Sequence, residues 1–306
     1  MTQPSVAHDA GARRGSRPSA LALVAIAALA LLALAAGQLT AQAMIPEPVI
    51  ALVDIYGPID PAFRANYQAR FDYINSHPEV AGVVLLIDSP GGEASASEEL
   101  YYDIARLRER IPVVASIMRL GASGAYYAAM GANYVMTKPG ANVGSIGVIS
   151  SVVSPTELTT TELTSGPFKA SGYSPVQFAR GLEMVKEHFA GVVYAERLIA
   201  WDRWHADAGP FPQTQDSLST GRVWAGAAAL DAGVVDGFGS TEDAIEQAAA
   251  MAGLRRYQVR YLDYNFMTEQ GYTIAFEDDT LPTIDEILAR IDEWPGYWYI
   301  FVPPVE

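Results

Sequence analysis

Residues 82–92 read GVVLLIDSPGG, and this stretch decides the fold. Its apolar run carries no polar alternation, which is typical of a strand buried on both faces of a parallel sheet. The Asp-Ser-Pro-Gly-Gly end predicts a tight turn, where glycine lets the backbone approach a ligand closely. Because ligands of open α/β sheets bind beyond the carboxyl ends of the strands, this turn marks one side of a candidate site.

The segments around this strand alternate between strand and helix patterns. Strands are expected at 49–56, 112–117, 134–136 and 257–264, and helices at 61–75, 96–110, 123–130, 175–206, 227–232 and 241–251. Such alternation predicts parallel strands joined by right-handed crossovers, with helices flanking the sheet. The expected fold class is therefore α/β.

The N-terminal region has the pattern of a membrane-targeting segment. Residues 20–36 are all Ala, Leu, Val or Ile, and Arg13, Arg14 and Arg17 precede them. The run reaches the roughly 17–25 residues of a transmembrane helix and exceeds a typical signal-peptide core of roughly 7–15 residues. We therefore favour a retained anchor over a removed signal peptide, although residues 41–43, Ala-Gln-Ala, resemble a cleavage site. The arginines predict a cytoplasmic N-terminus and place everything after the run outside the cell membrane.

Three regions follow from these patterns. Residues 1–44 form the cytoplasmic N-terminus and the anchor or signal segment, residues 45–255 a single α/β domain, and residues 256–306 a C-terminal extension. The extension ends in an aromatic stretch, residues 295–304. That stretch is expected to pack on the body, to insert at a membrane interface, or to lie in a substrate groove as an added strand.

Composition excludes several classes of function. The chain has 35 acidic against 20 basic residues and a net charge of −15, so it lacks the basic surface that nucleic-acid binding requires. It has no cysteine, which excludes disulfides, zinc–thiolate sites and a cysteine nucleophile. We expect no metal and no cofactor.

A candidate nucleophile lies in residues 120–129, LGASGAYYAA, where a predicted strand gives way to a helix. The serine here is Ser123, and a serine hydroxyl needs a neighbouring base to accept its proton. No histidine falls in a loop at a strand's carboxyl end, which weakens a Ser-His-Asp triad; the four are His8, His77, His188 and His205.

A neutral lysine can replace histidine as the base, because burial lowers the pKa of the ammonium group. Lys186 has Glu183 and Glu187 beside it, which keep it charged. Lys138 and Lys169 both remain candidates, and the immediate neighbours of Lys169 are uncharged.

Backbone N–H groups are available to stabilise an oxyanion. Gly92 lies in the turn described above, and Gly124 follows the candidate nucleophile at a helix start, where the helix dipole favours an anion.

Five blocks in this order resemble the signal peptide peptidase A family of bacteria and archaea. They are residues 87–92 (IDSPGG), 122–127 (ASGAYY), 144–148 (GSIGV), 165–169 (SGPFK) and 221–236, which opens GRVW and ends GVVD. The resemblance extends over residues 49–252.

The resemblance implies a ClpP/crotonase-like fold and a membrane-anchored serine endopeptidase with a Ser/Lys dyad. It implies that Ser123 is the nucleophile, Lys169 the general base, and Gly92 and Gly124 the oxyanion hole. The implied substrates are signal peptides after their release and other hydrophobic peptides. The implied assembly is a homo-oligomer at the membrane.

Three alternatives stay open. A related membrane-bound ClpP-class protease would share the chemistry and differ in its partners. A crotonase would need basic residues for the phosphates of coenzyme A, and no cluster of them is evident. A non-catalytic scaffold of the same fold would bind peptides without cleaving them.

Overall fold

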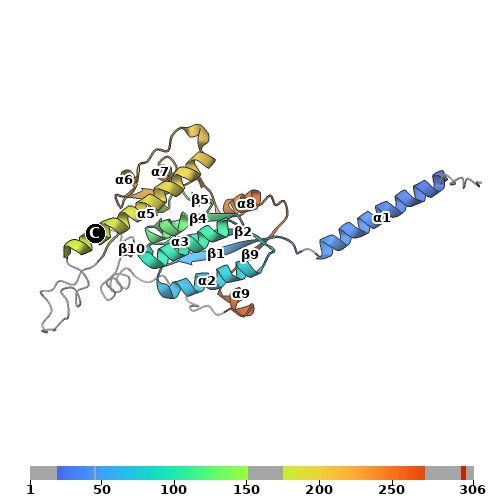
Figure 1. Cartoon of the computed structure of the whole chain (residues 1–306), viewed down its shortest axis with the longest axis horizontal. Coiled ribbons are helices and arrows are strands. Elements are labelled where there is room, and N and C mark those ends of the chain that lie inside the picture. The colour runs from blue at the N-terminus through green and yellow to red at the C-terminus, as the bar shows by residue number, and fades with distance from the viewer. Residues whose placement is uncertain (1–18, 45, 151–174, 273–297, 301–306) are drawn as a thin grey trace, which may run out of the picture. The chain divides into compact units, whose positions relative to one another are not determined.

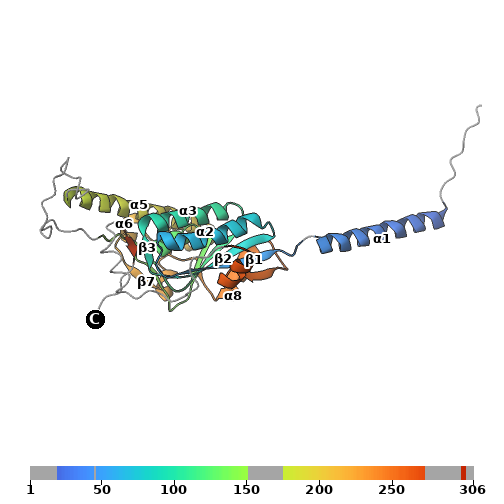
Figure 2. The same cartoon turned by 90° about the horizontal axis from the view of Figure 1, so that it is seen from below.

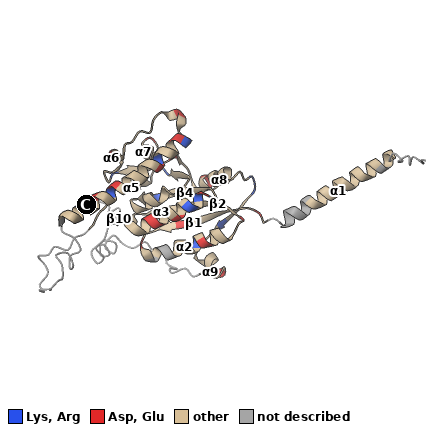
Figure 3. Ribbon diagram, viewed as in Figure 1, with Lys and Arg blue, Asp and Glu red and all other residues tan. Residues whose placement is uncertain are grey.

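The computed structural model of the chain describes residues 19–44, 46–150, 175–272 and 298–300 (Figure 1). Two compact units are present, residues 1–46 and residues 47–306. In the first unit, α1 (Ala20–Met44) is a helix of 25 residues, and its sequence contains no charged residue. The described side chains of α1 are all uncharged (Figure 3). Within the described part of the chain, no helix combines the length and apolar character that crossing a membrane requires. Residues 20–36 are therefore helical, as expected, but the structure does not show that they span a membrane.

The second unit alternates strands and helices as its sequence predicts. The strands are β1 (Val49–Tyr56), β2 (Val80–Ser89), β3 (Gly91–Glu93), β4 (Val113–Ala122), β5 (Tyr134–Thr137), β6 (Asn142–Gly144), β7 (Val223–Ala225), β8 (Gly237–Phe238), β9 (Gln258–Tyr261) and β10 (Trp298–Ile300). The helices are α2 (Pro61–Ser76), α3 (Ala94–Arg108), α4 (Gly124–Ala129), α5 (Pro175–Trp204), α6 (Gln215–Leu218), α7 (Gly226–Ala229), α8 (Thr241–Met251) and α9 (Tyr264–Glu269), with a short 3₁₀ turn, η2 (Ala206–Ala208).

An eight-stranded sheet runs in the order β7-β6-β4-β2-β1-β9, and β5 and β8 branch from β4. All of its strand pairs are parallel except β6 with β7. The long strand β4 pairs with β5 along its first half and with β6 along its last three residues. The α/β fold class with a parallel sheet and flanking helices is therefore confirmed.

Helices cover both faces of the sheet (Figure 2). One apolar core lies under α2, α3, α4 and α5 and includes fully buried tyrosines and phenylalanine. A smaller core lies under α8, where alanines allow the helix to approach β2 and β4 closely. The strand residues alternate between the two cores, so both faces of β2 are apolar, as the run in residues 82–87 predicts.

Local sequence signals fix several helix ends. Asp60 caps α2 by accepting a hydrogen bond from the Phe63 N–H at 2.8 Å, and Pro61 occupies the first helical position. Ser240 and Asp243 form a reciprocal capping box at α8. At α3 the expected start at residue 96 is two residues late, because the helix begins at Ala94 without a side-chain cap.

The predicted C-terminal extension contributes to the sheet. Its first strand, β9, pairs in parallel with β1 at the sheet edge, and Leu262 just after it is fully buried. Arg70 on α2 donates to the Leu262 carbonyl at 2.7 Å, which ties this region to the helical face. The sequence also predicts a helix at residues 283–291, and these lie outside the described residues.

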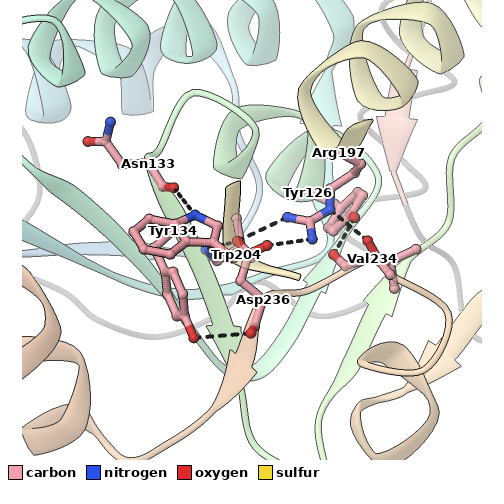
Figure 4. A network of polar contacts seen from close by, with 9 residues as sticks. Tyr126, Asn133, Tyr134, Arg197, Trp204, Val234 and Asp236 are labelled. Atoms are coloured by element: carbon pink, nitrogen blue, oxygen red, sulfur yellow. Dashed lines mark hydrogen bonds and ion pairs between the residues drawn. The ribbon is translucent and has the colours of Figure 1, made fainter. Parts of the chain in front are cut away.

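A buried ion pair joins α5 to the loop before β8 (Figure 4). The Arg197 guanidinium donates to both carboxylate oxygens of Asp236, at 2.7 and 3.1 Å, and to the Gly233 carbonyl at 2.8 Å. The Val135 N–H donates to the same carboxylate at 2.8 Å, so β5 is held too. Burial alone lowers the pKa of Arg197, but the Asp236 charge and Tyr126 outweigh it, and the pKa is raised.

Removing one partner of this pair leaves a buried charge without compensation. We expect Asp236→Ala to lower the free energy of unfolding by about 3–5 kcal/mol, measured by urea denaturation of the full chain. The matched control is Asp103→Ala, which removes an ion pair whose Arg106 side chain is 68% exposed and should cost less than about 1 kcal/mol. Equal losses in the two variants would show that the buried pair does not hold α5 to the sheet.

Candidate active site

Ser123 lies at the junction of β4 and α4 in a strained backbone conformation. Its φ is 54° and its ψ is −121°, a region that residues with a side chain rarely adopt. Its side chain makes no capping hydrogen bond to the first turn of α4, so the hydroxyl is not used to terminate the helix. A serine on a sharp strand-to-helix turn is the geometry of a nucleophile elbow.

The strained turn is held by the segment after β5. The Ser123 N–H donates to the Gly144 carbonyl at 2.6 Å, and the N–H of Ser145, which has a φ of 54°, donates to the Arg222 carbonyl at 2.7 Å. Gly144 has a φ of 105°, and a Cβ there would lie 2.5 Å from the ring of Trp224. Residues 144–148 and 221–226 therefore hold the Ser123 turn together, and we call these two segments the brace.

Two tyrosines fix the helix that begins after Ser123. The Tyr126 hydroxyl donates to the Val234 carbonyl at 2.5 Å, which links α4 to the buried ion-pair loop (Figure 4). The Tyr127 ring packs between Tyr101 of α3 and Phe189 of α5, with ring centroids 5.2 and 5.1 Å apart. Burial raises the pKa of both Tyr126 and Tyr127, so both hydroxyls stay protonated and able to donate.

The glycine turn after β2 is built by contacts that only glycine permits. Gly91 has a φ of 95°, and its N–H donates to the Ser89 hydroxyl at 3.1 Å. Ile59 bonds to both neighbours of Gly92: its N–H donates to the Gly91 carbonyl at 2.9 Å, and its carbonyl accepts from the Glu93 N–H at 2.8 Å. A Cβ on Gly92 would lie 1.9 Å from the Ile59 carbonyl oxygen.

The fold brings three of the four predicted site residues to one place. Ser89, at the end of β2, pairs with Gly121 at the end of β4, so the two strand ends that carry the candidate site are neighbours. Helix α4, with Gly124 as its first residue, packs against β3, which contains Gly92. Lys169, the fourth, lies outside the described residues.

The other lysines have contacts that do not involve Ser123. The Lys186 ammonium forms an ion pair with Glu183 at 2.5 Å, as its sequence neighbours predict. The Lys138 ammonium lies 3.3 Å from the Met118 sulfur. Met118 packs on the core under α8, whereas α4 packs on the opposite core. The Lys138 ammonium and the helix that follows Ser123 therefore lie on opposite faces of the sheet.

The three described histidines have packing or surface roles. The His77 ring stacks on Tyr73 with centroids 3.8 Å apart, and the His205 ring lies 4.8 Å from that of Trp201. His188 is exposed on α5, and its Nε2 lies 3.3 Å from the Tyr127 hydroxyl. In none of these contacts is the partner the Ser123 side chain. His8 lies outside the described residues.

At the strand ends, Asp88 pairs with Arg119 at 3.2 Å, and the arginine side chain is 66% exposed. Among the described residues, no group of three or more His, Asp or Glu side chains is arranged to hold a metal ion. A cavity of about 350 Å³ lies elsewhere, lined in part by Arg108, Glu196 and Arg203, and none of its lining residues is a predicted site residue.

The parallel sheet and the strained serine define an α/β protein with a serine on a sharp strand-to-helix turn. Comparison with known proteins shows what the chain is similar to. Residues 105–255 match the family model of peptidase family S49, which covers β4, the elbow and the brace behind it. The chain is 30% identical over 188 residues to Protease 4 of Salmonella typhi and 32% identical over 190 residues to Putative protease slr0021 of Synechocystis sp.. It is 26% identical over 238 residues to Putative signal peptide peptidase SppA of Enterococcus faecium. The resemblance to the signal peptide peptidase A family is thereby confirmed.

The matched relatives are longer than the aligned region. The three alignments cover 60%, 56% and 76% of this chain and 30%, 63% and 64% of the respective relatives. The chain therefore spans less than two thirds of the length of each. Among solved structures, the 1510-N membrane-bound stomatin-specific protease is 15% identical with a TM-score of 0.47, covering 72% of this chain and 99% of that one. ClpP1 from Listeria monocytogenes is 16% identical with a TM-score of 0.42, covering 63% and 94%.

Sequence reasoning missed two features of the site. The first is the brace, because the carbonyl of Arg222 and the ring of Trp224 reach residues 144–145 across nearly eighty positions of sequence. The signal for it is present in the glycine-rich residues 144–147. The second is the partner of β10: an added strand was one of three expectations for this stretch, but the sequence did not indicate that it would pair with β3 at the glycine turn.

The brace gives a direct test. We expect Gly144→Ala to lower the free energy of unfolding by about 1–3 kcal/mol, because alanine is strained at this φ and its Cβ meets the Trp224 ring. It should also slow the reaction of Ser123 with a fluorophosphonate probe, because the carbonyl that holds the elbow moves. The control is Gly140→Ala, where a Cβ meets nothing within 4 Å and stability should be unchanged. Probe labelling that is equally fast in both variants would show that the brace does not position Ser123.

Proposed function

We propose that the chain is a membrane-anchored serine endopeptidase with a Ser/Lys dyad, which cleaves signal peptides after their release and other hydrophobic peptides. The observation that carries the proposal is the strained conformation of Ser123 at a strand-to-helix junction, inside the region that matches peptidase family S49. The arrangement of the sheet and its helices supports a ClpP/crotonase-like fold for the domain.

The proposed reaction uses four groups. Lys169, neutral in its resting state, accepts the proton of the Ser123 hydroxyl as the oxygen attacks the substrate carbonyl. The N–H groups of Gly92 and Gly124 stabilise the oxyanion, and the second gains from the N-terminus of α4. The ammonium then gives its proton to the leaving amine, which leaves an acyl group on Ser123. Water, deprotonated by the same lysine, releases the acyl group and restores the serine.

A non-catalytic peptide-binding scaffold is the alternative of a different class. Strain at the serine argues against it, because a backbone in a sparsely populated region costs about 1–3 kcal/mol and persists where it has a role. A related membrane-bound ClpP-class protease would use the same residues, and substrate profiling separates it from the proposed peptidase.

We expect Ser123→Ala to abolish both fluorophosphonate labelling and peptide hydrolysis. Lys169→Ala should abolish hydrolysis with the fold retained by circular dichroism, and activity of the parent enzyme should rise with pH as a lysine deprotonates. Lys186→Ala is the matched control, since its ion pair with Glu183 is on the surface of α5. If Lys138→Ala loses activity and Lys169→Ala keeps it, the base is Lys138 and the proposed dyad is wrong. If the fluorophosphonate does not label the parent enzyme, the non-catalytic scaffold is favoured.

The membrane attachment and the assembly are further parts of the proposal. The arginines before residue 20 and the uncharged sequence of α1 support an anchor with a cytoplasmic N-terminus and the domain outside. Leu29, Leu32 and Leu34 of α1 are exposed and offer an apolar surface to lipid. The homo-oligomer rests on the resemblance to the signal peptide peptidase A family.

The anchor is tested in the full chain. We expect the double variant Leu29→Glu, Leu32→Glu to shift the protein from the membrane pellet to the supernatant, because buried carboxylates are costly in lipid. The conservative pair Leu29→Ile, Leu32→Ile should stay in the pellet. If both variants sediment alike, α1 does not provide the attachment.

A further inference from the structure

A methionine of β4 is surrounded by hydrogen-bond donors on the face of the sheet that α8 covers. The Met118 sulfur lies 3.3 Å from the Lys138 ammonium, 3.8 Å from the Thr241 hydroxyl and 4.0 Å from the Ser116 hydroxyl. Ser116 precedes Met118 by two residues on the same face of β4, Lys138 directly follows β5, and Thr241 is the first residue of α8. Three elements of the fold therefore bring a donor to one sulfur atom.

The sulfur makes poor use of these donors. A thioether is a weak acceptor, whereas the strong partners of an ammonium group are carboxylates and other oxygen acceptors. Within the described residues, the hydrogen-bonding contact of the Lys138 ammonium is this sulfur, while the Lys186 ammonium pairs with the Glu183 carboxylate. Ser116 is 1% exposed, so water does not supply a better partner for its hydroxyl. An oxygen atom at the place where these donors converge would be a much stronger acceptor.

We propose that Met118 is an oxidation site, and that Lys138, Thr241 and Ser116 form a binding site for the oxygen of its sulfoxide. Each donor lies farther from the sulfur than the about 2.5–3.2 Å of a hydrogen bond to oxygen, which leaves room for one more atom between them. The sulfoxide oxygen carries partial negative charge. Because Thr241 begins α8, a helix of 11 residues, the helix dipole favours that charge.

The oxidant is hydrogen peroxide, and the step balances within the site. A lone pair of the Met118 sulfur attacks one oxygen of the peroxide, the O–O bond breaks, and the sulfur loses two electrons to the peroxide. The Lys138 ammonium gives a proton to the departing hydroxide, which leaves as water. The amine then takes the proton of the new S–OH group, and the neutral sulfoxide remains. The Met118 side chain is partly exposed, so peroxide reaches the sulfur from solvent.

The same donors allow β4 to keep its place after oxidation. A methionine sulfoxide ordinarily disrupts a core because its oxygen is polar, and a buried acceptor without a donor is destabilising. Met118 packs on the core under α8, and its strand continues to the Ser123 turn. Since the new oxygen is hydrogen-bonded where it forms, we expect the sheet to tolerate the sulfoxide.

Peptide mass spectrometry after limited peroxide treatment of the full chain tests the oxidation. Met184, which is 69% exposed on α5, is the internal reference. Met118 should oxidise at least as fast as Met184 although it is less exposed. Lys138→Leu should slow the oxidation of Met118 several-fold and leave that of Met184 unchanged, and Lys138→Arg, which keeps a cationic donor, should restore the rate. If Met118 resists peroxide while Met184 is oxidised, or if Lys138→Leu leaves its rate unchanged, the proposal is wrong.

The stability of the oxidised protein tests the donors. The midpoint of thermal unfolding of the parent should fall after peroxide no further than that of Met118→Leu, which reports the effect of the other methionines. The double variant Lys138→Leu, Thr241→Val should lose at least about 2–4 °C more than the parent at equal Met118 sulfoxide content. Each protein is compared with its own untreated sample, so altered packing of the reduced variant does not enter.

Equal losses in the parent and in the double variant would show that these side chains do not bind the sulfoxide oxygen. Neither measurement uses turnover, so both outcomes are independent of the function proposed above.

Discussion

The rest of the site depends on one constrained residue, Ser123, whose backbone has a φ of 54° at the end of β4. A residue with a side chain holds that conformation only where its surroundings over-determine it. Here the Gly144 carbonyl accepts the serine N–H, the Trp224 ring packs on Gly144, and two tyrosines fix the following helix. These contacts therefore hold Ser123 in its strained conformation.

The buried pair of Arg197 and Asp236 extends this brace to α5. Its carboxylate holds β5 through the Val135 N–H, and the loop that carries it accepts the Tyr126 hydroxyl through Val234. A shift of α5 would therefore reach α4 and the serine through hydrogen bonds to a single loop. A second link joins α3 to α5, because the Tyr101 hydroxyl donates to the Glu196 carboxylate at 2.7 Å. Burial and then Glu196 raise the pKa of Tyr101 to about 12, so this hydroxyl stays protonated and able to donate.

Most of the fold was predictable because its signals are local. The apolar run at residues 82–87 predicts a strand buried on both faces, and the cap at Asp60 with Pro61 predicts the start of α2 to the residue. Ser95 with Glu98 three residues on has the sequence pattern of a capping box, but the prediction it makes is wrong, since the Ser95 hydroxyl donates to Glu93 at 2.5 Å and α3 begins earlier. Residues 20–36 form the expected helix, and their crossing of a membrane stays a prediction. The role of Lys169 also stays a prediction, because Lys169 lies outside the described residues.

The sequence by itself determined the alternation of strands and helices, the glycine turn at residues 91–92 and the serine at position 123, because these follow from periodicity and backbone freedom over a few residues. The tertiary structure alone decided which distant segments meet. It brought Arg222 and Trp224 behind the serine and laid Tyr299 along Gly92. Such contacts depend on the hydrogen-bonding direction of an unpaired strand edge, and any extended segment satisfies that requirement. No pattern in the tail could therefore name its partner before the sheet was built.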